Sequence, residues 1–294
     1  STVCAALGLA AARAGRRTII AELNTREKAP LFFGRPESGY DARQIFENLY
    51  SINIQPEPAL REYGLMKLKF ERVFDLVFEN EGMKRLLKMI PGMNELLLLG
   101  KAFNLERERD SRGKPVWDLI IVDAPATGHG VSLLRLPDVI LKVSKSGPMA
   151  DEVRDMRTLL TDPQRTRLNL VSLPEEMPVR ETQELMAQVR DVLRIPTGHL
   201  FINGIWPALF TPDQSTVMAK FDRAFGDVDP RLSGAVDCVE KVTERSQLHA
   251  RYVRELHETI DMPAVELPYL FRHDFGFGAI DDLSKKIVAQ MKPD

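Results

Sequence analysis

Two groups of residues in this chain have the types and spacing to handle phosphate and a divalent cation. The chain opens with the hydroxyl pair Ser1-Thr2, followed by small and apolar residues that predict a helix over about 2–14. The free N–H groups and the dipole at a helix N-terminus attract phosphate oxygens, and a hydroxyl there can bind Mg²⁺. Asp123 ends the apolar stretch 117–123, where a carboxylate can hold a water of the Mg²⁺ shell. Ser1, Thr2 and Asp123 are therefore candidate ligands for phosphate and magnesium.

These two groups match a known order of phosphate-binding elements. A hydroxyl pair that opens such a helix normally follows the Gly-Lys of a Walker A motif, and an apolar strand ending in Asp is typical of a Walker B carboxylate. Taken alone, Ser1-Thr2 is more often a plain N-cap pair. The strand at 18–22 and the strand that ends at Asp123 reverse that judgement. The pattern predicts an ATPase, with a glycine-rich segment ending Gly-Lys immediately before Ser1.

Two further segments could complete such a site. Residues 124–130 are small and glycine-rich, so they predict a loop around Gly128 that can move close to a γ-phosphate. The competing interpretation is an ordinary strand-to-helix turn with Asp123 as a cap. Asn203 ends another strand, and its amide could read an adenine edge through paired hydrogen bonds. A turn asparagine is the alternative there.

The elements that must position these residues alternate between helices and short β-branched strands. That order predicts an α/β protein with a mostly parallel, doubly wound sheet. We expect a single domain over 1–294, with helical insertions at about 57–108 and 209–260 and a closing helix at about 278–291. The expected strands lie near 18–22, 49–54, 117–123, 167–172, 199–205 and 264–267.

Composition narrows the functional classes. The 294 residues are 44% hydrophobic, enough for a substantial core, and the net charge of −2 gives no general attraction to nucleic acid or anionic membrane. Cys4 and Cys238 are too few for a disulfide framework or a CxxC metal site, and they fit a reducing cytoplasm. The chain contains no run of about 18 apolar residues, so we expect no transmembrane helix. We expect a cytoplasmic protein.

Several motifs in the chain resemble those of one family, the anion-transporting ATPases, which include the arsenite pump ATPase and the ATPase that targets tail-anchored membrane proteins. The segment 123–129 is similar to the family's switch II, and 267–269 is similar to the loop that closes over adenine. The other matching segments are 134–137, 90–95, 49–56 with Glu62-Tyr63, 173–182, and Asn203 with Pro207.

The resemblance implies a deviant Walker A loop with a second lysine, bound ATP and Mg²⁺, and ATP-driven closure of a dimer. The dimer could be a homodimer or a heterodimer, and its change of shape would be coupled to an unknown protein client or membrane partner, with no nucleic acid expected. The implied roles are phosphate and Mg²⁺ binding for Ser1 and Thr2, a hold on the Mg²⁺ water for Asp123, switching for Asn24 and Gly128, and adenine binding for Asn203, Leu267, Pro268 and Tyr269.

The chain departs from the family pattern in three ways. The switch I aspartate falls on Asn24, a poor base, so we expect slow hydrolysis or help from Glu22 or Glu27. The paired cysteines that bind zinc or arsenite have no counterparts, which argues against thiolate binding of metalloids. The span 129–162 is short, so the helices of a groove for tail-anchored clients are not expected.

Two alternatives remain open at the sequence level. One is a hydrolysis-impaired interaction subunit of the same fold, paired with an active paralogue, which Asn24 favours. The other is a partitioning-type ATPase that acts on DNA or membrane. The C-terminal segment 287–292 is too brief an amphipathic helix to favour that second alternative.

Overall fold

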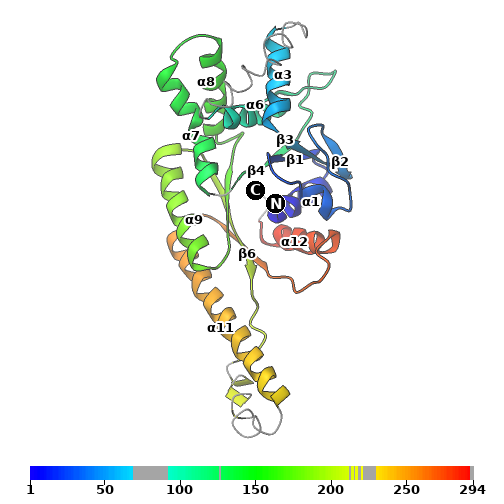
Figure 1. Ribbon diagram of the computed structural model, residues 1–294, viewed down its shortest axis with the longest axis vertical. Helices are drawn as coiled ribbons and strands as arrows, with labels where there is room; N and C mark the ends of the chain where they lie inside the picture. Colours follow the sequence, from blue (N-terminus) through cyan, green and yellow to red (C-terminus); the bar gives the residue numbers. More distant parts are fainter. Residues whose placement is uncertain are drawn as a thin grey trace. The chain divides into compact units, whose positions relative to one another are not determined.

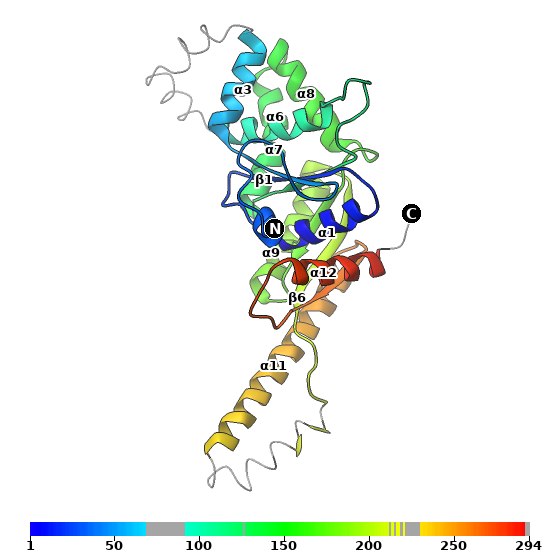
Figure 2. The ribbon, with the colours of Figure 1, turned by 90° about the vertical axis from the view of Figure 1, so that its right-hand side faces the viewer.

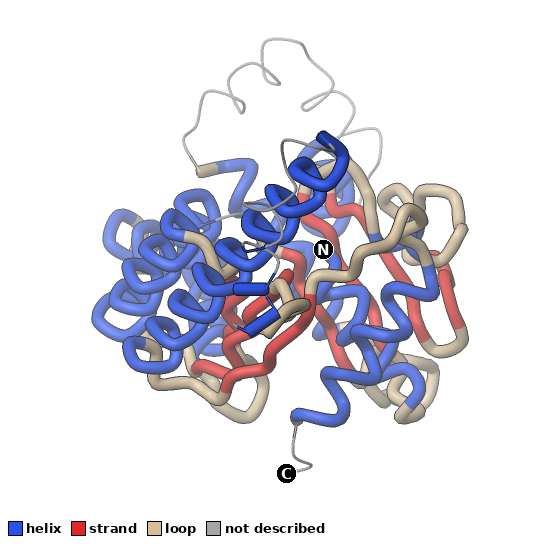
Figure 3. The backbone as a smooth tube through the Cα atoms, turned by 90° about the horizontal axis from the view of Figure 1, so that it is seen from below, coloured by secondary structure: helices blue, strands red, loops and turns tan. Residues whose placement is uncertain are grey.

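The computed structural model describes residues 1–68, 92–125, 127–211, 213–214, 216–217, 220 and 230–291 (Figure 1). The chain divides into two compact units, and each is described by itself. The first unit comprises Ser1–Arg167, Gln188–Pro196 and Arg272–Asp294, and the second comprises Leu168–Ala187 and Thr197–Phe271. Figure 3 distinguishes the helices from the strands along the described chain.

The sheet of the first unit is formed by β1 (Thr18–Leu23), β2 (Arg43–Phe46), β3 (Leu49–Ile54) and β4 (Leu119–Asp123). The strand order is β2-β3-β1-β4, and only β2 is antiparallel to its neighbour. Every residue of β1 is buried, as expected for a central parallel strand covered on both faces. The register places Glu22 beside both Asn53 and Asp123, so three polar residues meet at the carboxyl edge of the sheet.

Helix α1 (Thr2–Arg13) packs along the sheet and against α12 (Phe277–Gln290), and Figures 1 and 2 both show these two helices side by side. Small residues on α1 allow this close packing: a Cβ on Gly8 would lie 3.0 Å from side-chain atoms of Ile20 and Leu49. The remaining helices of the unit are α2 (Ala29–Phe32), α3 (Pro56–Leu68), α6 (Met93–Arg107), α7 (Thr127–Val143), α8 (Pro148–Thr161) and the π-helix η1 (Val189–Leu193).

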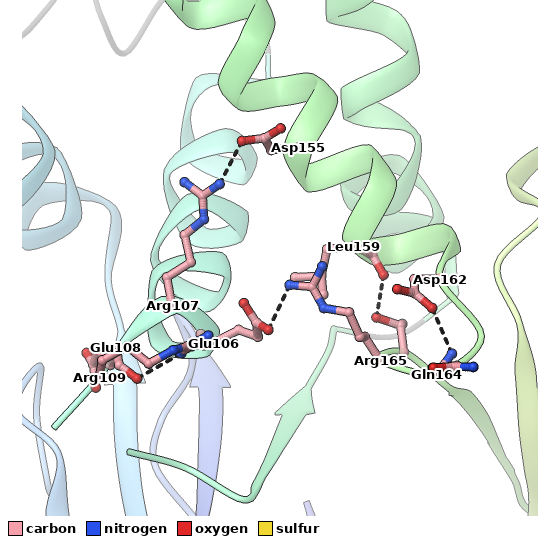
Figure 4. A network of polar contacts seen from close by, with 10 residues as sticks. Glu106, Arg107, Glu108, Arg109, Asp155, Leu159, Asp162, Gln164 and Arg165 are labelled. Atoms are coloured by element: carbon pink, nitrogen blue, oxygen red, sulfur yellow. Dashed lines mark hydrogen bonds and ion pairs between the residues drawn. The ribbon is translucent and has the colours of Figure 1, made fainter. Parts of the chain in front are cut away.

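A polar network joins the end of α6 to α8 and the turn that follows it (Figure 4). Arg107 contacts Asp155 at 2.6 Å, and Arg165 contacts Glu106 at 2.7 Å. These pairs are at least partly exposed, so each contributes only about 0–1 kcal/mol to stability. The network therefore contributes little to the stability of this unit.

The second unit contains β5 (Leu168–Ser172), β6 (Thr197–Ile205) and β7 (Ala264–Pro268) with α9 (Glu176–Gln188) and α11 (Pro230–Thr259). The three strands are parallel in the order β5-β6-β7. Their inward side chains pack against both helices in one cluster that includes Leu170, Val179, Leu200, Ile202, Tyr252, Leu256, Ile260 and Met262.

The structure confirms the α/β class with mostly parallel strands, and all six expected strands are present. Sequence reasoning missed the edge strand β2 because its polar, half-exposed residues lack an apolar run. The expected loop 124–130 is shorter than predicted: α7 begins at Thr127, so Gly128 lies in its first turn. Within the helical stretch expected at about 209–260, α11 begins at Pro230, and the described residues 213, 214, 216, 217 and 220 are also helical. The helical prediction for 69–91 lies outside the described residues.

Among the described helices, none combines the length and apolar character that a membrane span requires.

Candidate functional site

The first turn of α1 meets the carboxyl end of β4. Ser1 is the N-cap residue of α1, but its hydroxyl makes no capping hydrogen bond. The backbone nitrogen of Ser1 lies 3.3 Å from Oδ1 of Asp123. Two residues that lie 122 positions apart in the sequence are therefore brought together. The Ser1 hydroxyl does not cap the helix, although a plain N-cap was the alternative interpretation of Ser1-Thr2.

Asp123 is held by α1 through a second contact. The thiol of Cys4 donates to Oδ1 of Asp123 at 3.5 Å. Burial, together with the nearby Asp123 carboxylate, raises the pKa of Cys4 to about 12, so the thiol stays protonated and remains a donor. Within the described part of the chain, no group donates a hydrogen bond to Oδ2 of Asp123. That oxygen is free to accept a hydrogen bond from a metal-bound water.

Glu22 lies beside Asp123 in the register of β1 and β4 and is fully buried. Its carboxylate accepts hydrogen bonds from the backbone N–H of Lys28 at 2.8 Å and of Ala29 at 3.3 Å. Burial raises the pKa of Glu22, although the two N–H donors partly oppose that shift. Glu22 therefore caps the start of α2 and anchors the segment that follows β1.

Asn24 follows β1 directly and is exposed at a φ of 46°. Asparagine is one of the few side chains that tolerate this left-handed conformation. Its backbone N–H donates to the carbonyl of Ile54 at 2.8 Å. Three residues later, the buried Glu27 accepts hydrogen bonds from the N–H groups of Ser38 at 2.6 Å and Gly39 at 2.7 Å. Glu22 and Glu27 thus fasten both ends of the loop that carries Asn24.

Asn53, at the end of β3, is a site residue that sequence reasoning missed. Its side-chain N–H donates to the carbonyl of Thr25 at 2.8 Å, and its backbone N–H donates to Gly39 at 2.7 Å. Its Oδ1 is buried and has no hydrogen-bond partner among the described residues. The signal was present, because an asparagine ending an apolar strand is the same pattern that drew attention to Asn203.

The loop after β1 continues to the helices through Tyr40. The Tyr40 hydroxyl donates to Oε2 of Glu62 on α3 at 2.5 Å, and Lys101 on α6 contacts the other oxygen of Glu62 at 2.9 Å. Burial and the neighbouring Glu62 carboxylate raise the pKa of Tyr40, which keeps its hydroxyl protonated. A continuous series of contacts therefore runs from Glu27 at the sheet edge to α3 and α6.

The start of α7 follows Asp123 closely. A Cβ on Gly130 would lie 2.8 Å from the carbonyl oxygen of Pro125, so only glycine fits without movement. Gly128 is exposed and has open space around it. Thr2, the first residue of α1, is partly buried. Gly128 has room to approach a ligand, whereas Gly130 has a packing role.

The second unit contains the residues expected to bind adenine. Asn203 lies on β6, one residue before Gly204, whose φ of +75° turns the chain. The N–H of Tyr269 donates to the carbonyl of Ile205 at 2.8 Å, which joins the end of β6 to the segment after β7. Leu267 is fully buried, so its side chain belongs to the core and only its backbone is available to a ligand.

An aromatic cluster adjoins these strand ends. Trp206 lies 5.6 Å from Tyr269 and 5.1 Å from Phe271 between ring centroids, and Arg245 lies 4.8 Å from the Trp206 ring. Tyr269 and Phe271 are 47% and 54% exposed. The backbone N–H of Trp206 donates to Nδ1 of His249, whose pKa is lowered by burial and then by Arg245. Exposed aromatic rings in the segments that follow β6 and β7 suit a planar ligand.

The donor set bears on which metal could bind. In the described ranges, no group of three or more His, Cys, Asp or Glu side chains is arranged to hold a metal ion. Mg²⁺ usually keeps several waters and takes one or two protein carboxylates plus substrate phosphates. Asp123 with the uncapped hydroxyl of Ser1 fits that requirement.

Comparison with known proteins points to one family. The model of the family described as "Anion-transporting ATPase" matches residues 1–147 and 143–221 of the chain. Together these segments cover residues 1–221, which is most of the chain, and include every helix and strand of the first unit except α12.

Individual relatives agree with the family match. The chain is 25% identical to the ATPase BagA of Mycobacterium tuberculosis, covering 99% of this chain and 89% of that protein. It is 27% identical to the ATPase GET3 of Lachancea thermotolerans, over 55% of this chain and 57% of the relative. An ATPase ASNA1 homolog of Entamoeba histolytica is 24% identical over 52% and 57% of the two chains.

Proposed function

The chain belongs to the anion-transporting ATPase family and is an ATP-hydrolysing enzyme, and from this premise we propose that it acts in the cytoplasm as a dimeric conformational switch driven by ATP and Mg²⁺. The observation that carries the proposal is the contact between the first turn of α1 and Asp123 at the carboxyl edge of β1 and β4, where the Cys4 thiol donates to Oδ1 of Asp123 at 3.5 Å. Open α/β sheets bind their ligands at that edge.

Each residue of the first unit has a chemical role in this proposal. Ser1 offers its hydroxyl to the metal, and the N-terminus of α1, which begins at Thr2, attracts phosphate oxygens. Asp123 orients a metal-bound water through Oδ2, while Cys4 holds Oδ1 in place. Bound Mg²⁺ supplies charge neutralisation on the transferring phosphoryl group.

Asn24 and Gly128 are the proposed switch residues. Asn24 positions the attacking water through its amide, and Gly128 lets the start of α7 approach the γ-phosphate. The contacts of Glu27 with Ser38 and Gly39, continued by Tyr40 and Glu62, support a route from Asn24 to α3 and α6. A change of nucleotide at the sheet edge would then move these helices, which we assign to the contact with a client.

The second unit supplies the proposed adenine site. Asn203 reads the base edge, and the backbone of 267–269 with the exposed Tyr269 ring covers its face. The hydrogen bond between Tyr269 and Ile205 supports this assignment, because it holds the covering segment beside the strand that carries Asn203.

Sedimentation velocity on the full-length protein tests the dimeric switch by measuring dimerisation in two states. One is the unmodified protein with ADP, and the other is the Asp123→Asn variant with ATP, which this variant should hydrolyse slowly. We expect ATP to tighten dimerisation at least about tenfold, a typical allosteric coupling. The matched control is Asp118→Asn, which should dimerise as the unmodified protein does. Asp118 is exposed, and its carboxylate accepts a hydrogen bond from the backbone N–H of Arg17. Equal dimerisation with both nucleotides would contradict the switch.

A hydrolysis-impaired interaction subunit is the second candidate, favoured by the neutral Asn24. The Asn24→Asp variant separates the two functions. Asparagine and aspartate both tolerate the positive φ of this residue, so the change tests chemistry rather than folding. If the protein is a slow ATPase, turnover should rise in the variant. If turnover stays at background in both forms while ATP still binds, the interaction subunit is the better account.

A further inference from the structure

An open groove of about 470 Å³ lies between α7, α8 and η1, all within the first unit. Its size is within the range of small-molecule sites, which run from about 300 to 1,000 Å³. Four basic residues line it, namely Arg135, Lys142, Arg157 and Arg194, together with two acidic residues, Asp138 and Asp191. The nucleotide-site residues Ser1, Thr2, Asp123 and Asn24 do not line it.

The charges of this groove are unbalanced, because both acidic residues are already paired. Asp138 accepts a hydrogen bond from Nε of Arg157 at 2.7 Å. Asp191 accepts one from Nε of Arg190 at 2.8 Å. Arg135, Lys142 and Arg194, the other three cations, have no acidic partner among the described residues and are exposed. The lining therefore presents three uncompensated positive charges from two separate elements.

The backbone that presents Arg194 is unusual in two respects. The preceding turn, η1, is a π-helix, closed by a hydrogen bond of 2.7 Å from the N–H of Arg194 to the carbonyl of Val189. Single π-helical turns are rare and occur frequently at functional sites. Arg194 itself has a φ of 54°, a conformation that is costly for a side chain of this kind. Two rare backbone features thus carry one arginine to the wall of the groove.

The groove also has an apolar component. Val139, Leu141 and Val192 line it, and the two valines are 49% and 45% exposed. These apolar side chains can cover a short carbon skeleton. The three unpaired cations suit carboxylate or phosphate oxygens, which form charge-assisted hydrogen bonds with arginine.

We propose that this groove is a binding site for a small organic polyanion, with two or more carboxylate or phosphate groups on a short carbon skeleton. Arg135 and Lys142 bind the anionic groups from α7, and Arg194 binds them from the end of η1. The site is separate from the nucleotide site and does not depend on the proposed switch.

Isothermal titration calorimetry of the full-length protein at low salt tests the proposal, with citrate and 2,3-bisphosphoglycerate as probes. We expect one saturable site for at least one probe, with a Kd that saturating ADP does not change. The double variant R135Q/R194Q should weaken binding at least about 100-fold, since each lost charged contact is worth roughly tenfold or more. The matched control R154Q removes an arginine of α8 that pairs with Asp151 outside the groove, and it should bind as the unmodified protein does.

Three results would overturn the proposal. The first is no saturable binding of either probe, and the second is equal binding by R135Q/R194Q and R154Q. The third is loss of binding when ADP is present, which would place the anion at the nucleotide site. Cosedimentation with anionic vesicles that requires Arg135 and Arg194, without binding of either soluble probe, would assign the groove to a membrane surface instead. If thermal melting shows that R135Q/R194Q does not fold, the exposed K142Q variant should still weaken binding about tenfold.

Discussion

Glu22 and Asp123 lie side by side at the carboxyl ends of β1 and β4, yet their carboxylates serve different purposes. Glu22 is fully buried, and its hydrogen bonds go to the backbone of Lys28 and Ala29. Asp123 is partly exposed and is held through one oxygen only, by the first turn of α1. Glu22 therefore anchors the loop after β1, whereas Asp123 is the residue proposed to hold the metal.

Replacing Asp123 with asparagine should lower kcat for ATP hydrolysis on the order of 100-fold or more, because the metal contributes several kcal/mol of charge stabilisation. Steady-state hydrolysis by the full-length protein measures the effect. Asp118→Asn, near the start of the same strand, is the matched control and should keep its turnover. Similar turnover in both variants would remove Asp123 from the site.

Glu27→Ala should lower the free energy of unfolding by about 2–4 kcal/mol, since it leaves the N–H groups of Ser38 and Gly39 unpaired. Hydrogen exchange at these two amides should become faster, and urea unfolding measures the stability. The exposed neighbour Glu37 provides the control, and Glu37→Ala should change neither quantity. Unchanged exchange in Glu27→Ala would mean that other contacts hold the loop.

The pH dependence of stability should contain a contribution from Glu22. Burial holds the pKa of Glu22 above its ordinary value of 4.5, so the unfolded chain releases this proton first as the pH rises. The free energy of unfolding therefore falls as the pH rises from 4.5 through the raised pKa of the folded state, and it is level above that window.

Glu22→Gln removes the titrating group but keeps an oxygen that can accept hydrogen bonds from Lys28 and Ala29. The difference in stability between the unmodified protein and this variant should therefore decline across that window. Urea unfolding in a series of buffers provides the measurement. A difference that stays constant with pH would show that the folded and unfolded chains bind the Glu22 proton equally.

Gly130 and Gly128 offer a matched pair in the first turn of α7. Gly130→Ala should lower the free energy of unfolding by about 1–3 kcal/mol, because its Cβ would lie 2.8 Å from the carbonyl oxygen of Pro125. Gly128→Ala meets open space and should raise stability by up to about 1 kcal/mol through helix propensity. Thermal melting compares the two, and equal effects would contradict the close contact at Gly130.

The two cysteines should differ in reactivity. Cys4 is a poor nucleophile, because its pKa is raised to about 12 and its thiol donates to Asp123, whereas Cys238 is exposed on α11. Iodoacetamide should therefore modify Cys238 readily and Cys4 only after unfolding, as peptide mass spectrometry can measure. Rapid modification of Cys4 in the folded protein would show that the first turn of α1 opens.

The residues proposed for the nucleotide site follow from local sequence pattern. The apolar run that ends in Asp123 and the small-residue helix that begins after Ser1 each follow from a rule about strand ends or helix starts. Because parallel strands present their carboxyl ends at one edge, such rules also indicate where these residues gather. The same reasoning predicted the α/β class, and it would have found Asn53 had it been applied to every strand.

The partners of these residues could not be predicted in that way. Nothing in the sequence spacing pairs Cys4 with Asp123, Glu27 with Gly39 or Tyr40 with Glu62, because those contacts depend on how the chain packs between distant segments. The basic groove is a further case: Arg135 and Arg194 lie 59 positions apart, and only the packing of α7 with the π-helical turn brings them to one cavity. Local periodicity determined the elements and the type of chemistry, whereas tertiary packing decided which side chains meet, since burial and hydrogen bonding between distant segments are properties of the folded chain.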